Sequence, residues 1–354
     1  MVPDYRGRFQ PFDNARMRTY PLASRGNKVG LADSVDCARL RAAPPARESA
    51  DVAEIAGHIV ACRRAGRPVI LMSGAHPIKN GLGPIIIDLI ERGLVTLYAT
   101  NGASTIHTFE LALTGASSED VRKALPRGEF GMAFETCVYI NQALTEAHAM
   151  GIGYGEAMGR LVEDAGFRKR VLDAVFKRFP DDPAYLKPYD GFPYADVSVF
   201  ARALRRGVPA TVHASIGTDI IDQHANFDPA AKGATSGRDF LIYTEEIAKC
   251  TAGGVVLNIG SAVMGPEVFL KAVSMAANMG RTPDKLYAAN FDIRPFVFDD
   301  NSRDESQYYY YLRDQKSIAT RIPRVFNGKG YYVQGDHRET LPLLYQYIMR
   351  AWEA

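Results

Sequence analysis

The chain has 354 residues, and its 47% apolar and 23% charged content is close to the globular average. A formal net charge of +2 without a lysine–arginine block argues against nucleic-acid binding through phosphates, and four scattered cysteines argue against a disulfide framework or a structural zinc. A polar N-terminus and the lack of an apolar run of about 18 residues predict a cytoplasmic protein with no membrane span.

The first elements in chain order predict alternating helices and strands. Residues 1–50 are rich in Arg, Pro and Ala and predict an irregular N-terminal arm, whereas 51–354 predict a single α/β domain. In the first half of that domain we expect a helix over 51–66, a buried strand from 68, a helix over 83–93, a strand from 94 and a helix over 105–115. Strand, glycine loop and helix in this order are typical of a parallel sheet covered on both faces.

A helical section over roughly 135–180 interrupts the alternation, which then resumes. The later predicted elements are a helix over 197–207, a strand from 208, a helix over 239–254, a strand from 255, a helix over 266–280, a strand over 285–292 and a final helix over 340–354. The sequence therefore predicts an α/β protein in which helices flank a parallel sheet.

Four predicted strands end in loops of small and polar residues. These loops are Ser73-Gly74-Ala75-His76, Thr100-Asn101-Gly102-Ala103, Ser215–Asp219 and Asn258-Ile259-Gly260-Ser261. Ligands of open parallel sheets bind outside the carboxyl ends of strands, where glycine allows close approach and helix N-termini favour phosphate. Four such loops favour a nucleotide site, although each glycine alone is also explained by a tight turn. Neither G-x-G-x-x-G nor the P-loop motif is present, which argues against an ordinary dinucleotide-dependent dehydrogenase or a P-loop enzyme.

Several stretches resemble deoxyhypusine synthase and its relatives in the same NAD-binding superfamily. They include VILMSGAHPIKNG from residue 69, GEF from 128, VPATVHASIGTDI from 208, VVLNIGSAVM from 255 and VQGDHRETLPLL from 333. The segment NGASTIHTFELAL from 101 is also similar to the C-terminal domain of alternative-type, NAD-dependent ornithine cyclodeaminases. Both families draw a hydride from a carbon that bears nitrogen. The resemblance thus implies a Rossmann-like fold of the deoxyhypusine synthase kind, NAD as cofactor and a small amine, polyamine or basic amino acid as substrate.

The resemblance also implies cofactor contacts, position by position. The contacts carried over from the family are His76, Lys79, Thr100, Asn101, Gly102, Asn258, Gly260, Ser261, Asn290 and Asp336. Ser73 and Gly74, which end the first strand, are predicted cofactor contacts as well. The chain departs from the family where the polyamine-binding histidine falls at about Met264 and where the Ser-Trp-Gly-Lys motif has no clear copy. Lys329 and Lys316 are the local substitutes for the lysine of that motif.

Two groups of side chains are candidates for proton transfer or imine formation. His107 and Glu110 lie three residues apart on a predicted helix, so both can face one crevice, and a histidine near neutral pKa suits proton removal. A helix-start histidine bound to a backbone carbonyl is the alternative. Lys329 lies between two glycines and would form an imine if it were buried, whereas a surface charge is the ordinary role of a lysine.

Asp219, Asp222 and His224 follow the third loop and could bind a cationic substrate, although a solvated acidic loop explains them equally well. Their spacing matches no standard ligand set, so no metal is expected. The expected partners are a small-molecule amine, a protein lysine as an alternative acceptor, and further copies of the chain in a homo-oligomer (dimer or tetramer) whose shared sites the arm could complete. The alternative function is an NAD-binding or sensing protein of the same fold without catalysis.

Overall fold

The centre of the computed structural model, which describes residues 5–180, 191–296 and 313–354, is a six-stranded parallel sheet. Its strands are β2 (Val69–Ser73), β3 (Leu97–Thr100), β5 (Ala210–Val212), β6 (Gly254–Ile259), β7 (Leu286–Asp292) and β8 (Gly330–Gln334). They lie in the order β5-β3-β2-β6-β7-β8. Counted along the chain within this sheet, that is the order 3-2-1-4-5-6 of doubly wound folds that bind dinucleotides. The predicted fold class, a parallel sheet flanked by helices, is confirmed.

The strands form because short apolar runs can be buried on both faces of a parallel sheet. All of β2 and β6 is buried, and successive side chains point to opposite faces. Val69 and Leu71 join one apolar cluster, whereas Ile70 and Met72 join a second one on the other face. Two apolar cores therefore hold the sheet rigidly between layers of helices.

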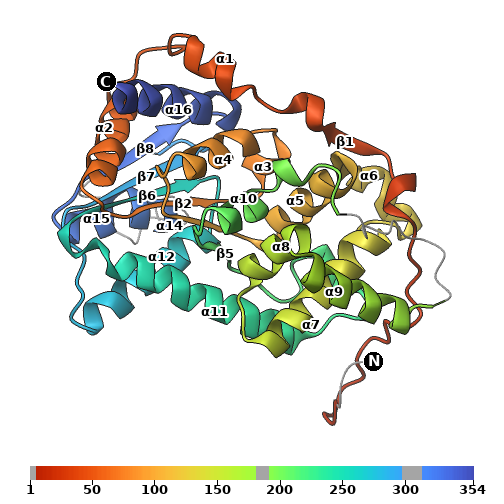
Figure 1. Ribbon diagram of the computed structural model, residues 1–354. Helices are drawn as coiled ribbons and strands as arrows, with labels where there is room; N and C mark the ends of the chain where they lie inside the picture. The colour runs from red at the N-terminus through yellow and green to blue at the C-terminus, as the bar shows by residue number, and fades with distance from the viewer. Residues whose placement is uncertain (1–4, 181–190, 297–312) are drawn as a thin grey trace.

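Figure 1 shows these helical layers. One face is covered by α2 (Ala50–Arg64), α4 (Gly83–Glu91), α10 (Val199–Arg205) and α16 (His337–Glu353), and the other by α11 (Pro229–Ala248), α12 (Met264–Asn278) and α15 (Ile322–Val325). Beyond the β5 end of the sheet lie α7 (Ile140–Met150), α8 (Tyr154–Glu163) and α9 (Ala165–Arg178), preceded by a π-helical turn, η4 (Glu135–Tyr139). This confirms the predicted helical section.

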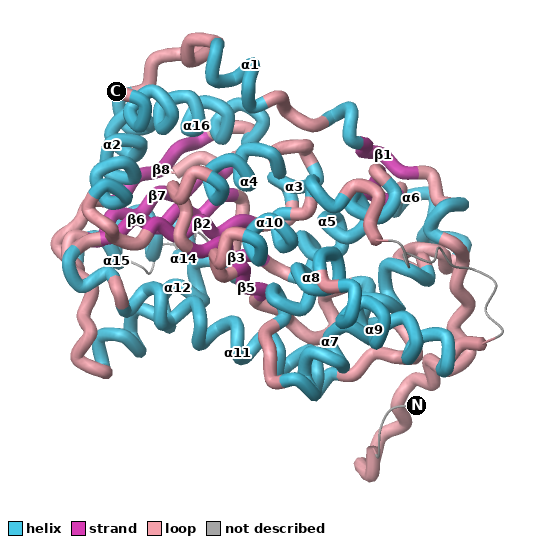
Figure 2. The backbone as a smooth tube through the Cα atoms, in the orientation of Figure 1, coloured by secondary structure: helices cyan, strands magenta, loops and turns pink. Residues whose placement is uncertain are grey.

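The remaining helical elements connect these layers. They are α3 (His76–Lys79), α5 (Gly102–Thr114), α6 (Val121–Ala124), α14 (Arg313–Lys316), η3 (Leu125–Arg127), η5 (Ala195–Val197), η6 (Ile220–Gln223), η7 (Cys250–Ala252) and η8 (Ser317–Arg321). Figure 2 shows the strands of the six-stranded sheet lying together, while β1 stands apart from them. The carboxyl ends of the strands point toward α3 and α5, which begin directly after β2 and β3.

The N-terminal residues are more regular than the sequence predicts. They contain η1 (Leu22–Ser24), β1 (Asn27–Gly30), η2 (Leu31–Asp33) and α1 (Cys37–Ala42). β1 pairs antiparallel with β4 (Ala116–Glu119), and Arg41 donates a 2.7 Å hydrogen bond to the Tyr345 hydroxyl on α16. The arm therefore packs along its own chain. Its strand is short and polar, so it carries no apolar alternation that the sequence could reveal.

Two other elements differ from the expectation. Helix α11 begins at Pro229, well before residue 239, because Asp228 accepts hydrogen bonds from two backbone amides of its first turn. Strand β8 was not expected, and it adds a sixth strand to the edge of the sheet beside β7.

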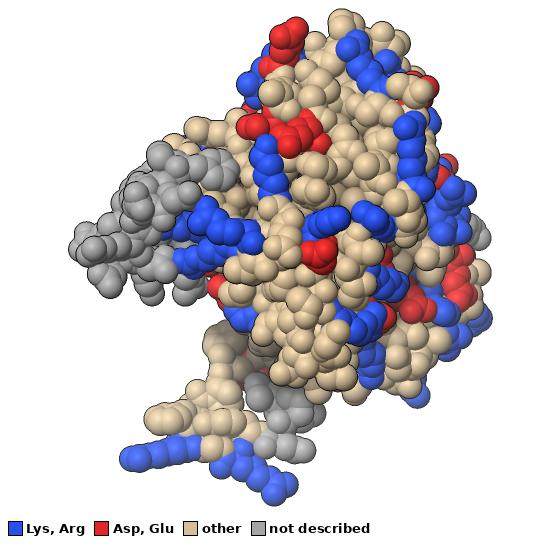
Figure 3. All heavy atoms as spheres, turned by 90° about the vertical axis from the view of Figure 1, so that its left-hand side faces the viewer, with Lys and Arg blue, Asp and Glu red and all other residues tan. Residues whose placement is uncertain are grey.

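The surface carries charges of both signs. On the side of the molecule in Figure 3, Lys and Arg side chains are interspersed with Asp and Glu among neutral residues. Within the described residues, no helix combines the length and apolar character that crossing a bilayer requires.

Candidate functional site

The loops after β2 and β6 meet at the point where the strand order reverses. These two strands are neighbours, but the chain leaves β2 toward one face and β6 toward the other. The Gly74 amide donates a 3.0 Å hydrogen bond to the Ile259 carbonyl, and a Cβ atom at Gly74 would overlap the Gly260 carbonyl. Gly260 has a φ of 67°, which favours glycine, and a Cβ there would overlap the His337 ring. The structure therefore brings these two predicted loops into direct contact.

Buried amides without full hydrogen bonding lie beside this contact. The Asn258 Nδ2 atom lies 2.6 Å from Asn290 Oδ1 and 2.9 Å from the Ser261 carbonyl. Within the described residues, Asn258 Oδ1 and Asn290 Nδ2 are buried and have no hydrogen-bond partner. Such an atom costs about 1–3 kcal/mol, so it calls for a structural or functional reason. Asn258 and Asn290 thus each contribute one unsatisfied polar atom at this edge of the sheet.

The ends of β2 and β3 are joined by buried hydroxyl groups. Thr100 Oγ1 lies 2.9 Å from the Ser73 carbonyl and 2.6 Å from Ser104 Oγ, and Ser73 Oγ lies 2.9 Å from the Tyr98 hydroxyl. All four side chains are buried. Ser73 and Thr100, both predicted cofactor contacts, thus use their side chains to fix the two strand ends relative to each other.

The N-terminus of α5 already faces an acidic group. Asn101 caps the helix by accepting a hydrogen bond from the Ser104 amide, and Gly102 leaves room for the Asp219 carboxylate, which a Cβ atom would overlap. A carboxylate at a helix N-terminus takes the favourable position that a phosphate would otherwise occupy. Phosphate binding at this particular helix, which the sequence led us to expect, is therefore disfavoured.

A pocket of about 260 Å³ lies between α3, α5 and the N-terminal arm. The predicted residues that line it are Lys79, His107, Glu110 and Asp219. Arg25 from the arm and Glu119 at the end of β4 complete its charged wall, and neither was identified from the sequence. Residues predicted separately as cofactor contact, catalytic pair and substrate contact therefore come together in one pocket next to the carboxyl ends of β2 and β3.

Glu110 and His107 are joined by a hydrogen-bond network in the wall of this pocket. Glu110 is 1% exposed and forms a 2.6 Å ion pair with Arg25. It accepts hydrogen bonds from Thr136 Oγ1 at 2.8 Å and from Ser117 Oγ at 2.7 Å, and Ser117 Oγ lies 2.7 Å from His107 Nδ1. Burial lowers the pKa of His107 to about 4, so its imidazole is neutral at physiological pH.

A buried lysine organises the acidic residues after β5. Lys232 on α11 is 1% exposed, and its Nζ lies 2.8 Å from Asp219 Oδ2 and 2.7 Å from Asp222 Oδ1. Burial raises the pKa of Asp219, and the Lys232 ammonium opposes that shift. Lys232 thus lies between two carboxyl groups, of which Asp219 is the one that lines the pocket. Sequence reasoning missed Lys232 because the predicted helix began beyond it.

The remaining substrate candidates have structural roles. Asp222 lies within η6, where it completes the capping box with the N-cap residue Asp219, and it accepts a hydrogen bond from the Gly217 amide at 2.7 Å. His224 is buried, and its Nε2 lies 2.8 Å from the Gly131 carbonyl, while burial lowers its pKa. Neither residue lines the pocket around His107.

Lys329 lies at the wrong end of the sheet for the role predicted for it. It directly precedes β8, at the amino edge, whereas the pocket and the glycine contact lie at the carboxyl edge. Its side chain is 53% exposed and forms a 2.5 Å ion pair with Glu54. The condition for imine formation, burial near the site, is not met. Lys316, the other local substitute, is buried at the end of α14.

Two predicted cofactor contacts lie around α3 and α16. His76 begins α3, and burial together with the Lys79 and His337 charges lowers its pKa. Asp336 caps α16 and forms a 2.6 Å ion pair with Arg338, whose hydrogen bonds lower the pKa of Asp336 to about 2. Asp336 is thus an anion that already has a cationic partner.

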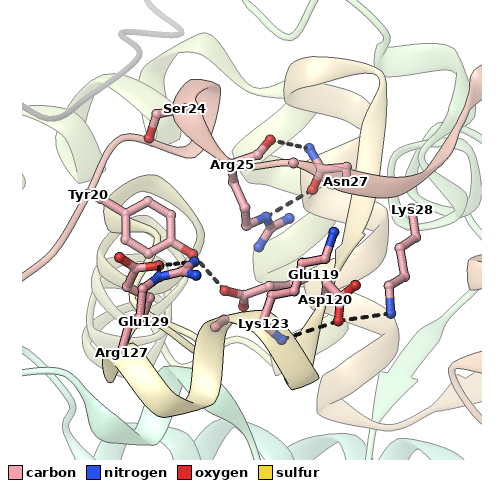
Figure 4. Close-up of a pocket in the computed structure, with 12 residues that line it drawn as sticks. Tyr20, Ser24, Arg25, Asn27, Lys28, Glu119, Asp120, Lys123, Arg127 and Glu129 are labelled. Atoms are coloured by element: carbon pink, nitrogen blue, oxygen red, sulfur yellow. Dashed lines mark hydrogen bonds and ion pairs between the residues drawn. The ribbon is translucent and has the colours of Figure 1, made fainter.

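A second cavity of about 430 Å³ adjoins the first and shares Arg25 and Glu119 with it. Figure 4 shows how side chains of the arm and of the β4–α6 segment surround it. The charged side chains around it are Arg25, Lys28, Lys123, Arg127, Glu119, Asp120 and Glu129. The Tyr20 hydroxyl donates to Glu119 at 2.8 Å, and Lys28 lies 3.4 Å from Asp120. Both signs of charge therefore line this cavity, which adjoins the pocket around His107 (the inner pocket).

Within the part of the chain that the structure describes, no group of three His, Cys, Asp or Glu side chains is arranged to hold a metal ion. No protein-family model matches the chain, and no curated protein sequence matches it.

Solved structures do match the fold, at low identity. ArgZ, an arginine dihydrolase from the ornithine–ammonia cycle in cyanobacteria, is 15% identical with a TM-score of 0.46, over 86% of this chain and 33% of ArgZ. AgrE, solved as a ternary complex with ornithine and NAD+, is 14% identical with a TM-score of 0.43, over 90% of this chain and 34% of AgrE. A protein described as a deoxyhypusine synthase from Entamoeba histolytica is 10% identical with a TM-score of 0.45, over 85% of this chain and 88% of that protein. The chain thus spans about a third of ArgZ and AgrE, and deoxyhypusine synthase, the family that its sequence motifs resemble, is among the matched structures.

Proposed function

We propose that this protein is an NAD-dependent enzyme that removes a hydride from the carbon next to the nitrogen of a small amino acid or amine. One observation carries the proposal. A pocket with a neutral histidine, an acidic wall and a lysine lies beside the carboxyl edge of a sheet whose strand order is that of dinucleotide-binding folds.

The carboxyl edge offers the contacts that a dinucleotide needs. The close contact of Gly74 and Gly260 leaves no side chain between the two loops, and the unpartnered atoms of Asn258 and Asn290 can bond to polar groups of the ligand. Exposed aliphatic side chains follow three of the strands at the same edge: Ile216, Val263 and Ile293. Planar rings would cover such side chains. When bound, the nicotinamide supplies an acceptor for a hydride.

The charges of the inner pocket favour an amino acid over a polyamine. Asp219 presents the acidic wall to an ammonium group, while Lys79 presents a cation that suits a carboxylate. Arg25 and Glu110 compensate each other as an ion pair. A polyamine would bring a second ammonium toward Lys79, whereas an amino acid brings one charge of each sign.

His107 would take a proton from the substrate ammonium, breaking one N–H bond and leaving the electron pair on nitrogen. That pair forms the C=N bond as the hydride leaves the neighbouring carbon, so the product is a protonated imine. Water would hydrolyse it to a carbonyl compound and ammonium, or a second amine, including a protein lysine, would accept the carbon group.

Assembly into a homo-oligomer remains a prediction of the family resemblance.

The test combines the purified chain with NAD+ and a panel of basic amino acids, neutral amino acids, diamines and polyamines. We expect an amino acid to give reduced nicotinamide, seen by its near-ultraviolet absorbance, or new amine products if the hydride returns. The His107→Gln variant should lose at least about 100-fold in kcat. His148→Gln is the matched control, because His148 is an exposed histidine on α7. Binding of NAD+ without turnover of any amine would instead favour a sensing protein.

A further inference from the structure

The side chain of Ser117, on β4, lies between those of His107 and Glu110, the two candidate catalytic residues on α5. It is fully buried in β4, where it pairs with Val29 of β1. Its hydroxyl oxygen lies 2.7 Å from Glu110 Oε2 and 2.7 Å from His107 Nδ1. One hydroxyl group thus connects the carboxylate and the imidazole, and the N-terminal arm holds the strand that carries it.

The number of protons in this network determines which atom donates each hydrogen bond and which atom accepts it. Glu110 is ion-paired with Arg25, and an ionised carboxylate only accepts hydrogen bonds. The single hydroxyl proton of Ser117 therefore points to Glu110, which leaves the Ser117 oxygen as an acceptor toward His107. Only a proton on Nδ1 can complete that second bond, so the neutral imidazole keeps its lone pair on Nε2.

The Nε2 atom is left available for a ligand. Within the described residues it makes no hydrogen bond, and the His107 ring lines the inner pocket. The charged groups that act on this ring are Glu110 on its own helix, Lys79 and His76 on α3, and Arg25 on the arm. Burial is the largest cause of the lowered pKa of His107; Glu110 opposes it, and the positive charges of Lys79 and Arg25 add to it.

We infer that Ser117 is a positioning residue that fixes His107 in the Nδ1–H tautomer and so leaves Nε2 unprotonated toward the pocket, where it would face the substrate nitrogen. The catalytic meaning of this inference rests on the proposed function, but the tautomer itself does not. Ser118, the next residue, has a φ of 74°, a left-handed conformation that is strained for a serine. That conformation interrupts the alternation of β4, so Ser117 and Ser118 are both buried. The strained backbone of Ser118 thus lies directly after Ser117, whose side chain points toward α5.

The test is nitrogen NMR of the full chain labelled with ¹⁵N-histidine at neutral pH, with His107 assigned from the His107→Gln spectrum. In the unmodified protein we expect a protonated Nδ1 and an unprotonated Nε2. The Ser117→Ala variant should shift His107 toward the Nε2–H tautomer, which free imidazole side chains prefer in water. A protonated Nε2 in the unmodified protein would overturn the inference, and this measurement needs no variant at Ser117.

The matched control is Thr136→Ala. Thr136 donates a 2.8 Å hydrogen bond to the other oxygen of Glu110 but does not contact His107. Its loss should leave the His107 tautomer unchanged, and a change equal to that in Ser117→Ala would show that only Glu110 matters. In a turnover assay, Ser117→Ala should lower kcat roughly tenfold with little change in KM. If the chain turned over no amine, the proposed function would fail while the tautomer result still stood.

Discussion

The two edges of the central sheet are built from the same strands but differ in how their polar groups are satisfied. At the amino edge, Lys329 pairs with Glu54 in solvent, and His58 lies 2.9 Å from the Tyr331 hydroxyl and stacks on Tyr287. At the carboxyl edge, glycines replace side chains, and two buried amide atoms have no partner among the described residues.

This difference indicates which edge has been shaped for a ligand. Exposed and fully partnered charges add little to stability and need no further explanation. Buried and unpartnered polar atoms cost free energy unless something binds them. This contrast supports the proposal that the carboxyl edge binds the ligand and that the amino edge has a structural role.

The largest effect is expected at the contact between the two glycine loops. Gly74→Ala would force a Cβ into the Gly260 carbonyl and separate the loops. We expect NAD+ affinity to fall by at least about 100-fold, measured by calorimetry. Gly57→Ala is the control, because a Cβ at Gly57 in α2 meets nothing within 4 Å and alanine favours the helix. Equal NAD+ affinity in the two variants would contradict the proposal that NAD+ binds at the carboxyl edge.

The next largest effect concerns the acidic wall. Asp219→Asn removes the charge that faces the pocket, while Lys232 keeps its bonds to both oxygens of Asp222. We expect KM for the amine substrate to rise at least about tenfold with NAD+ affinity little changed.

Asp222→Asn is the matched variant, because it perturbs the same buried lysine without reaching the pocket. It should lower the free energy of unfolding and leave KM nearly unchanged. If Asp222→Asn raised KM as much as Asp219→Asn, the cluster would act as a scaffold and not as a substrate contact.

A third prediction uses pH to separate buried from exposed carboxyl groups. Asp239 accepts from the Val212 amide at the end of β5, and burial raises its pKa to about 7. Because the folded state then holds the proton more tightly, this stabilisation is complete below the unfolded pKa near 4 and is lost as pH rises through 7. The loss should be up to about 4 kcal/mol in urea unfolding and absent in Asp239→Asn.

The pKa shift of Glu54, at the amino edge, has the opposite sign to that of Asp239. Lys329 lowers its pKa, so any stabilisation is present above the unfolded pKa and is lost as pH falls. The pair is exposed, so Glu54→Gln should barely alter the pH profile. A profile for Asp239→Asn that follows the unmodified protein would show that Asp239 is not the titrating group.

The smallest effect is expected for Lys329→Met. The loss of an exposed ion pair should change the free energy of unfolding by less than about 1 kcal/mol and kcat by less than about twofold. A loss of turnover comparable to that of His107→Gln would restore Lys329 to the reaction and contradict the division between the edges.

These residues also show what the sequence could and could not predict. Continuous apolar runs predicted β2 and β6, and glycines at their ends predicted the loops that meet there, because both signals are local. The position of Lys329 could not be predicted because β8 was not predicted, and a lysine directly before a parallel strand must lie at the amino edge.

Other parts of the site carry no local signal. Gly233 and Gly237 weaken the helical pattern over the first turns of α11. The sequence therefore did not place Lys232 on this helix or predict its contact with Asp219. Ser117 lies in the polar strand β4, and Arg25 lies in an arm without periodicity. Their roles depend on pairing between β1 and β4, which are distant in the sequence and lack apolar alternation.

Amide hydrogen exchange with and without NAD+ tests the central claim most directly, since it reports both edges of the sheet at once. We expect NAD+ to protect the loops after β2 and β6 and the carboxyl end of β7, with little change at the amino ends of β7 and β8. Unchanged exchange at the carboxyl edge, or protection confined to the region of Lys329 and Glu54, would contradict the account.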